Sequence, residues 1–174
     1  MELKGSNFTL RPWKKGDEES LAKHANNKKI ADNVTDSFPH PYTLKDAEEW
    51  INIRKKEGRN GKTSFAVSVD AHAVGSISIG LQDKELKYTG ILGYWLGEEH
   101  WGKGIISEAI SIITNHAFNE LGLERVEARV FEFNAASIRV LEKNGFKKEG
   151  VLRKRIFKNN NLVDEYMFAK LKEE

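Results

Sequence analysis

A glycine-rich segment between an apolar run and a long amphipathic stretch carries the clearest chemical signal in the sequence. It reads GEEHWGKGI and runs from Gly97 to Ile105. Glycine lets backbone approach a ligand closely, and the free N–H groups of a helix's first turn, aided by the helix dipole, attract phosphate. The segment therefore predicts a site for a phosphate or pyrophosphate at the start of a helix.

Two nucleotide-binding motifs match this segment only in part. Gly97 to Lys103 fits G-x-x-x-x-G-K, but Gly104 follows where a P-loop needs Ser or Thr for magnesium. The run from Gly102 to Gly104 begins a dinucleotide fingerprint, but Ser107 replaces its third glycine and the preceding strand comes from a meander. A plain structural turn is the remaining alternative for the loop taken alone.

A second cluster of polar side chains is expected at the start of a later helix. Asn134 is suited to cap that helix, and Ser137 falls on its first turn. Both side chains would then gather near the end of the preceding strand. An ordinary cap beside a solvated serine is the alternative interpretation.

The composition excludes several classes of function. The 174 residues include no cysteine, which excludes disulfides, thiolate metal sites and a cysteine acyl-enzyme. Lys and Arg number 28 against 26 Asp and Glu, so no overall field indicates a nucleic-acid partner. A solvated strand face is the preferred interpretation of the local basic residues Lys147, Lys148, Arg153, Lys154, Arg155 and Lys158.

No segment approaches the roughly 20 apolar residues of a membrane span, and the N-terminus lacks a signal-peptide core. We therefore expect a protein of the cytoplasm with no membrane partner. We also expect a single domain over residues 1–174, as a monomer or homodimer.

Apolar periodicity and turn residues predict about seven strands and about four helices. The expected strands are Phe8–Trp13, Thr63–Val69, Val74–Leu81, Lys87–Leu96, Val126–Val130, Phe146–Phe157 and Val163–Leu171. The expected helices begin at Asp17, at Thr43 or Asp46, at Ile105 and at Asn134, and the last three end near Gly58, Gly122 and Gly145. This order predicts an α/β (α+β) fold, a meander plus one strand–helix–strand crossover, in which a mixed, mostly antiparallel sheet has helices on both faces.

Four segments in this order resemble the GNAT superfamily of N-acetyltransferases, in particular the branch of the ribosomal-protein N-terminal acetyltransferases RimJ and RimL. They are LRPW from Leu10, FPHPYTLKDAEEWI from Phe38, GYWLGEEHWGKGIISEAI from Gly93 and NAASIRVLEKNGFKKEGVLR from Asn134. The resemblance covers nearly the whole chain. It implies a GNAT-like fold and an acetyl-coenzyme A (acetyl-CoA) donor, with no metal.

The resemblance also implies which residues hold coenzyme A. The implied cofactor-binding residues are Trp95, Leu96, His100, Trp101, Gly102, Lys103, Gly104, Ile105, Asn134 and Ser137. Backbone N–H groups from His100 to Ile105 would do most of the holding, and Lys103 could add a charge contact. The family motif begins with Gln or Arg where this chain has Glu99, so we expect that carboxylate to point away from the phosphates.

In the implied reaction the amine attacks the thioester directly within a ternary complex. A backbone N–H near Leu96 would stabilise the oxyanion, and Ser137 would protonate the thiolate. Relatives often carry an acidic residue at the position of Ile91, so the general base is not assigned. The candidates for it are Glu98, His40, Asp164 and Glu127, each of which could equally be an ordinary surface residue.

The acceptor site is expected at the loop that holds Phe38, His40 and Tyr42, with Tyr94 on the neighbouring strand. The leading hypothesis is transfer to the α-amino group of a protein or peptide. The alternatives are transfer to a small amine (a polyamine, amino acid or antibiotic) and a coenzyme A binding module without turnover.

Overall fold

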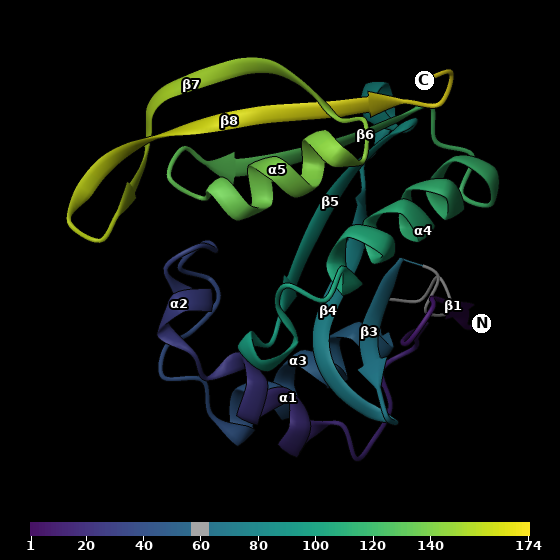
Figure 1. The fold of residues 1–174 in the computed structure, drawn as a ribbon, viewed down its shortest axis with the longest axis vertical. Coiled ribbons are helices and arrows are strands. Elements are labelled where there is room, and N and C mark those ends of the chain that lie inside the picture. The colour runs from purple at the N-terminus through teal and green to yellow at the C-terminus, as the bar shows by residue number, and fades with distance from the viewer. Residues whose placement is uncertain (57–62) are drawn as a thin grey trace. The chain divides into compact units, whose positions relative to one another are not determined.

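The computed structural model describes residues 1–56 and 63–174 and has the expected mixed α/β fold. The strands follow the order β1-β2-β3-β4-β5-β6-β8-β7. The chain divides into two compact units, Met1–Ser78 with Tyr94–Ala109, and Ile79–Gly93 with Ile110–Glu174 (Figure 1). Whether residues 1–174 form a single domain remains a prediction.

The fold class is confirmed, with small differences in the number of elements. Among the described residues there are eight strands and five α-helices, where about seven and about four were expected. The additional elements are the two-residue strand β1 (Leu3–Lys4) and the four-residue helix α2 (Lys28–Ala31). Both are too short to show an apolar period, which explains why the sequence did not reveal them.

The first unit contains three antiparallel strands and, up to Ser78, most of a fourth. β1 pairs with β2 (Thr9–Arg11), β2 pairs with β3 (Ser64–Val69), and β3 pairs with β4 (His72–Leu81). Leu10, Phe65 and Val67 are fully buried, as expected for alternating strands rich in β-branched and aromatic residues.

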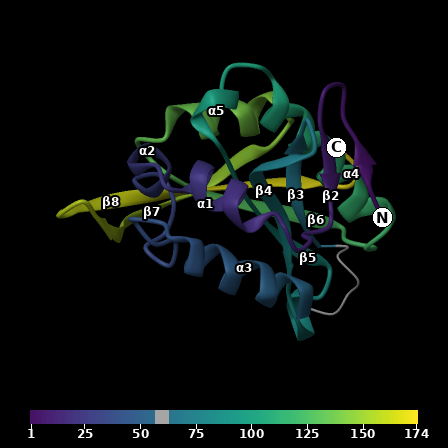
Figure 2. The same cartoon turned by 90° about the horizontal axis from the view of Figure 1, so that it is seen from below.

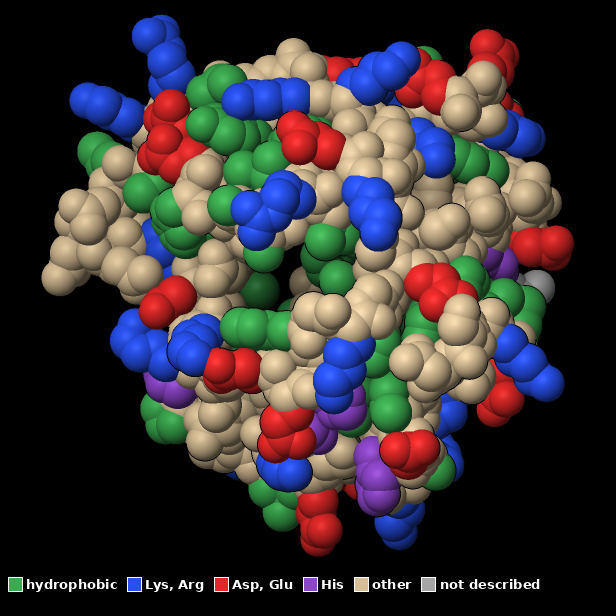
Figure 3. Space-filling view, viewed as in Figure 1, with side chains coloured by type: hydrophobic (Ala, Val, Ile, Leu, Met, Phe, Trp, Pro, Cys, Tyr) green, Lys and Arg blue, Asp and Glu red, His purple; other side chains and the backbone are tan. Residues whose placement is uncertain are grey.

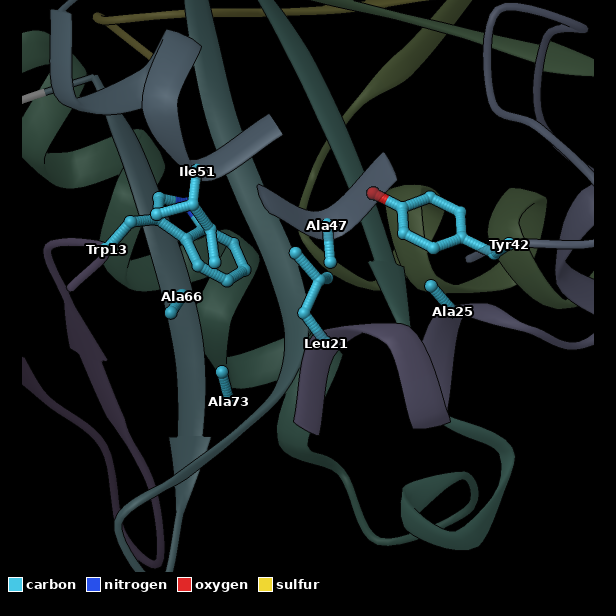
Figure 4. Packing of buried hydrophobic residues seen from close by; sticks show 8 residues of the cluster. All are labelled: Trp13, Leu21, Ala25, Tyr42, Ala47, Ile51, Ala66 and Ala73. Carbon is cyan, nitrogen blue, oxygen red and sulfur yellow. The ribbon is translucent and has the colours of Figure 1, made fainter. Parts of the chain in front are cut away.

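Helices α1 (Glu18–Ala25) and α3 (Leu44–Lys56) of the same unit pack against each other (Figure 2). Their contact forms an apolar cluster with residues of the strands (Figure 4). Its buried members are Trp13, Leu21, Ala25, Tyr42, Ala47, Ile51, Ala66 and Ala73. The cluster fixes α1 and the loop before α3, which carries the expected acceptor residues.

The start of α3 confirms the prediction from Thr43 and Asp46. The backbone N–H of Thr43 donates to Asp46 Oδ2 at 2.7 Å, and the backbone N–H of Asp46 donates to Thr43 Oγ1 at 3.3 Å. This is a reciprocal capping box with aspartate in the acidic position. The expected end of this helix near Gly58 lies outside the described residues.

The start of α1 agrees with the helix start predicted at Asp17, but the side chain of Asp17 has a different role from a cap. Asp17 occupies the N-cap position but makes no side-chain bond to the helix. Its carboxylate instead accepts two hydrogen bonds from the Arg11 guanidinium, at 2.8 Å and 2.7 Å. Both side chains are buried, so the residue that precedes the helix ties it to β2.

The strand β5 (Thr89–Leu96), which belongs to the second unit up to Gly93, pairs in parallel with β6 (Arg125–Phe131). This pairing confirms the crossover that passes through α4 (Ile105–Asn119). The register of the two strands runs from Thr89 opposite Arg125 to Leu92 opposite Ala128. β5 continues to Leu96 and β6 to Phe131. The pairing between β5 and β6 therefore stops at Leu92 and Ala128, before the last residues of either strand.

The second unit ends in a long hairpin of β7 (Lys147–Lys158) and β8 (Asn161–Leu171), yellow-green and yellow in Figure 1. Its turn residues Asn159 and Asn160 have φ of 50° and 61°, as expected for asparagine in a two-residue turn. Helix α5 (Ala135–Lys143) packs against β6 of this unit.

The charged side chains agree with the near-zero net charge. Figure 3 shows Lys and Arg interspersed with Asp and Glu over the visible face. Among the described residues, no helix has the length and apolar character needed to cross a membrane.

Candidate active site

The glycine loop owes its shape to two residues in the left-handed region. Gly102 has φ of +71° and Gly104 has φ of +77°. A Cβ built on either would meet nothing within 4 Å, so glycine is required there by backbone conformation and not by space.

Hydrogen bonds hold the loop against the end of β5. The indole Nε1 of Trp101 donates to the Leu96 carbonyl at 2.7 Å, and the His100 N–H donates to the Gly97 carbonyl at 2.9 Å. The N–H of Gly97 donates to the Val74 carbonyl at 2.8 Å, which fixes the strand end to β4. The loop therefore leaves β5 in a defined direction before α4 begins.

The first hydrogen bond of α4 joins the Glu108 N–H to the Gly104 carbonyl at 3.1 Å. A helix offers no internal acceptor to the N–H groups that precede its first such bond. These donors and the positive end of the helix dipole make the segment from Gly104 onward suitable for an anion. Lys103 is exposed beside it.

The two acidic residues before the loop have cationic partners of their own. Glu99 pairs with Lys23 of α1, with 3.6 Å between Oε1 and Nζ. Glu98 forms an ion pair with Lys29 and accepts a hydrogen bond from Asn27 Nδ2 at 2.7 Å. These partners lie some 70 positions earlier in the chain, so no local signal in the sequence indicated them.

The expected acceptor residues of the first unit form an aromatic group. The ring centroid of Phe38 lies 5.0 Å from that of Tyr42 and 5.7 Å from that of Trp95. Burial raises the pKa of Tyr42 to about 12, so its phenol stays protonated. His40 is exposed beside this group, and Tyr94 is half-buried on β5.

Asn134 and Ser137 meet in the second unit as the sequence predicted. Asn134 Oδ1 accepts a hydrogen bond from the Ser137 N–H at 3.1 Å, which makes Asn134 the side-chain cap of α5. Both residues are half-buried. Their binding roles remain predictions, as do those of the loop residues.

The carboxylates of three candidate bases already interact with other groups of the chain. Hydrogen bonds from Lys29 and Asn27 lower the pKa of Glu98. Glu127, opposite Ile91 in the β5–β6 register, accepts from Arg125 Nε at 2.8 Å. Asp164 accepts from the backbone N–H of Lys154 at 2.8 Å and stabilises an irregular part of β7.

Replacing Glu98 with glutamine is therefore expected to change kcat less than about threefold. A carboxylate whose pKa is lowered is a weak base, whereas loss of a true general base costs about 10²–10⁴-fold. Steady-state kinetics from pH 6 to 9 would test this, with Glu19→Gln on α1 as the matched control. A loss of about 100-fold, restricted to Glu98→Gln, would identify this residue as the base.

A comparison with protein families identifies the family of the chain. The model of the acetyltransferase (GNAT) domain matches residues 7–147, so the chain belongs to this family of acetyltransferases. The uncharacterized N-acetyltransferase p20 of Bacillus licheniformis is 33% identical over 169 residues, covering 96% of this chain and 94% of the relative. The ribosomal-protein-serine acetyltransferase of Escherichia coli is 32% identical over 107 residues, covering 62% of this chain and 59% of the relative.

Solved structures agree with this family. An acetyltransferase of the GNAT family from Bacillus anthracis matches with a TM-score of 0.85 and 26% identity, covering 100% of both chains. Two further structures show the same fold. Mycobacterium smegmatis RimJ in complex with CoA-disulfide has a TM-score of 0.84 and 24% identity, covering 95% of this chain and 82% of that one. Vibrio cholerae spermidine N-acetyltransferase in complex with CoA and spermine has a TM-score of 0.80 and 23% identity, covering 97% and 98%.

Proposed function

We propose that this acetyltransferase moves acetyl from acetyl-CoA to the α-amino group of a protein or peptide in the cytoplasm. The observation that carries the proposal is the glycine loop, where two left-handed residues turn the backbone into the start of α4. Family membership and the coenzyme A complexes of fold neighbours support the choice of donor. The resemblance to a ribosomal-protein acetyltransferase supports the choice of acceptor.

In this proposal the N–H groups from Gly102 to Ile105 hold the pyrophosphate, because a helix N-terminus offers donors and a positive dipole to an anion. The N–H groups of His100 and Trp101, which the sequence also assigned to this role, instead donate to the carbonyls of Gly97 and Glu98 at 2.9 Å and 3.1 Å. Trp95 and Leu96 border the pantetheine, with Asn134 and Ser137 contributing from α5. Lys103 adds a charge contact with phosphate. The acceptor lies against Tyr94 and the aromatic group of Phe38, Tyr42 and Trp95, with His40 at its edge.

In the proposed reaction the acetyl group passes directly from the bound donor to the bound acceptor, without an acyl-enzyme intermediate. The neutral amine attacks the thioester carbonyl, and the N–H of Leu96 stabilises the oxyanion. The C–N bond forms, the C–S bond breaks, and Ser137 relays a proton from water to the departing thiolate, so that its hydroxyl is restored. The amine loses its proton to water. Direct transfer suits a chain that has no cysteine to carry the acyl group.

A screen of acceptors tests this function. Thiol release from acetyl-CoA would be followed with peptides that differ in their first residues, and with spermidine and free amino acids as small amines. Mass spectrometry would locate the acetyl group. Transfer to peptide α-amino groups supports the proposal, whereas turnover of small amines alone would reassign the acceptor. Tight coenzyme A binding without any turnover would indicate a binding module.

Replacing Gly102 with alanine is expected to raise KM for acetyl-CoA about tenfold. A side chain at this φ costs about 1–2 kcal/mol, and the loop relieves that strain by moving the N–H groups away from the phosphate. Gly16→Ala is the matched control, since Gly16 has φ of +98° and equally open space but lies before α1. Equal KM values for the two variants would contradict the role of the loop.

A further inference from the structure

The side chains of two histidines and a glutamate meet beside the glycine loop, and the proposed acetyl transfer uses none of these three side chains. They are His24 on α1, and Glu99 and His100 in the short helical turn Glu98–His100. One ligand atom from each lies within 4.8 Å of the others. Figure 3 shows histidine and acidic side chains gathered together on the visible face.

The imidazoles have no competing hydrogen bonds. Over residues 1–56 and 63–174, the structure gives neither ring a hydrogen-bond partner, and their only ring contact is with each other, at a centroid distance of 5.5 Å and an interplanar angle of 63°. Imidazoles near neutral pH normally find donors or acceptors when they are removed from water. His24 is 9% exposed, so little of its ring is in contact with solvent.

The position of His24 is fixed by the absence of a side chain at Gly97. A Cβ built on Gly97 would lie 2.7 Å from His24 Nδ1. The glycine therefore provides the space in which the ring sits, and the ring is held between α1 and the end of β5. His24 is thus a rigid candidate ligand, and the side chains of Glu99 and His100 can move toward it. Such a combination favours a metal site.

We propose that His24, Glu99 and His100 bind a divalent late transition metal such as Zn²⁺, which clamps α1 to the turn before the glycine loop. Imidazole nitrogen and carboxylate oxygen are common Zn²⁺ ligands, and three protein ligands leave a fourth position for water. Tetrahedral bonds of about 2.0–2.1 Å require ligand atoms about 3.3 Å apart. The exposed Glu99 and the half-buried His100 can close the remaining distance by rotamer changes.

The environment of the three side chains influences their affinity for a metal ion. Burial lowers the pKa of His24, and the adjacent Lys23 lowers it further. Burial and Lys103 lower the pKa of His100. Lys23 opposes the cation and must give up Glu99, but exposed ion pairs of this kind are weak.

Calorimetric titration of the full, tag-free chain with ZnCl₂ tests the site, after treatment with a chelator and in the absence of acetyl-CoA. We expect one ion per chain, and Co²⁺ in its place should show the visible absorption of four-coordinate cobalt. Because no acyl donor is present, the result does not depend on the proposed acetyl transfer.

Variants assign the ligands. His100→Gln and Glu99→Gln are each expected to weaken Zn²⁺ binding at least tenfold. Glu98→Gln, which removes the neighbouring carboxylate, and His72→Gln, which removes a nearby imidazole, should bind as the unmodified chain does. Glu99 and His100 can both be tested even if His24→Gln does not fold. Absence of one-site binding, or equal affinity in His100→Gln and His72→Gln, would overturn the proposal.

Discussion

Replacing Ser137 with alanine is expected to lower kcat about 100-fold while KM for acetyl-CoA changes little. Loss of a group that transfers a proton in the transition state costs about 10²–10⁴-fold. The cap of α5 should survive, because the backbone N–H of Ser137, which donates to Asn134 Oδ1, is kept in the variant. Measuring the product formed at fixed times with a reactive peptide acceptor would give kcat and KM for acetyl-CoA.

Two comparisons distinguish proton transfer by Ser137 from a structural effect. Ser111→Ala removes an exposed hydroxyl from α4 and serves as the matched control. An acetyl thioester of an acidic aromatic thiol has a leaving group that needs no proton, so the deficit of Ser137→Ala should shrink with that donor. If the deficit is the same with both donors, Ser137 does not protonate the thiolate.

Replacing Asp17 with alanine is expected to lower the free energy of unfolding by about 3–5 kcal/mol, because removal of one partner leaves a buried charge without compensation. The Arg11 guanidinium would keep only weaker partners, Ser68 Oγ at 3.1 Å and the carbonyls of Pro12 and Ala71 at 3.2 Å. The N–H of Lys14, which donates to Asp17 at 3.0 Å, would also lose its acceptor.

Urea denaturation of the variant and of a surface control would measure this loss. Lys28→Ala breaks the exposed pair of Lys28 and Asp32 and should cost no more than about 1 kcal/mol. The double variant Arg11→Met with Asp17→Leu should recover much of the stability, because it buries no charge. If Asp17→Ala costs no more than Lys28→Ala, the buried pair does not hold β2 to α1.

The elements with a strong local signal were predicted well from the sequence. Asn134 as a cap and the start of α3 at Thr43 both depend on residues within a few positions of one another. Such interactions are visible in sequence because the partners are brought together by the local backbone alone.

Features that depend on distant partners could not be predicted in the same way. Asp17 was interpreted as a helix start, but its carboxylate binds Arg11, which reaches it only once β2 is in place. The contact of His24 with Gly97 joins positions 73 apart, and no spacing rule connects them. The sequence therefore predicted the glycine loop and the cap of α5 in the candidate site. It did not predict the ion pairs or the histidine cluster.

The glycines of the loop are required for two different reasons. Gly97 has φ of −57°, which any residue can adopt, and only the ring of His24 and the Val74 carbonyl, 3.1 Å from the built Cβ, leave no room. Gly102 has ample room but a torsion angle that suits a mirror-image amino acid better than a natural one. The segment thus depends on small volume at its beginning and on the absence of chirality at its end.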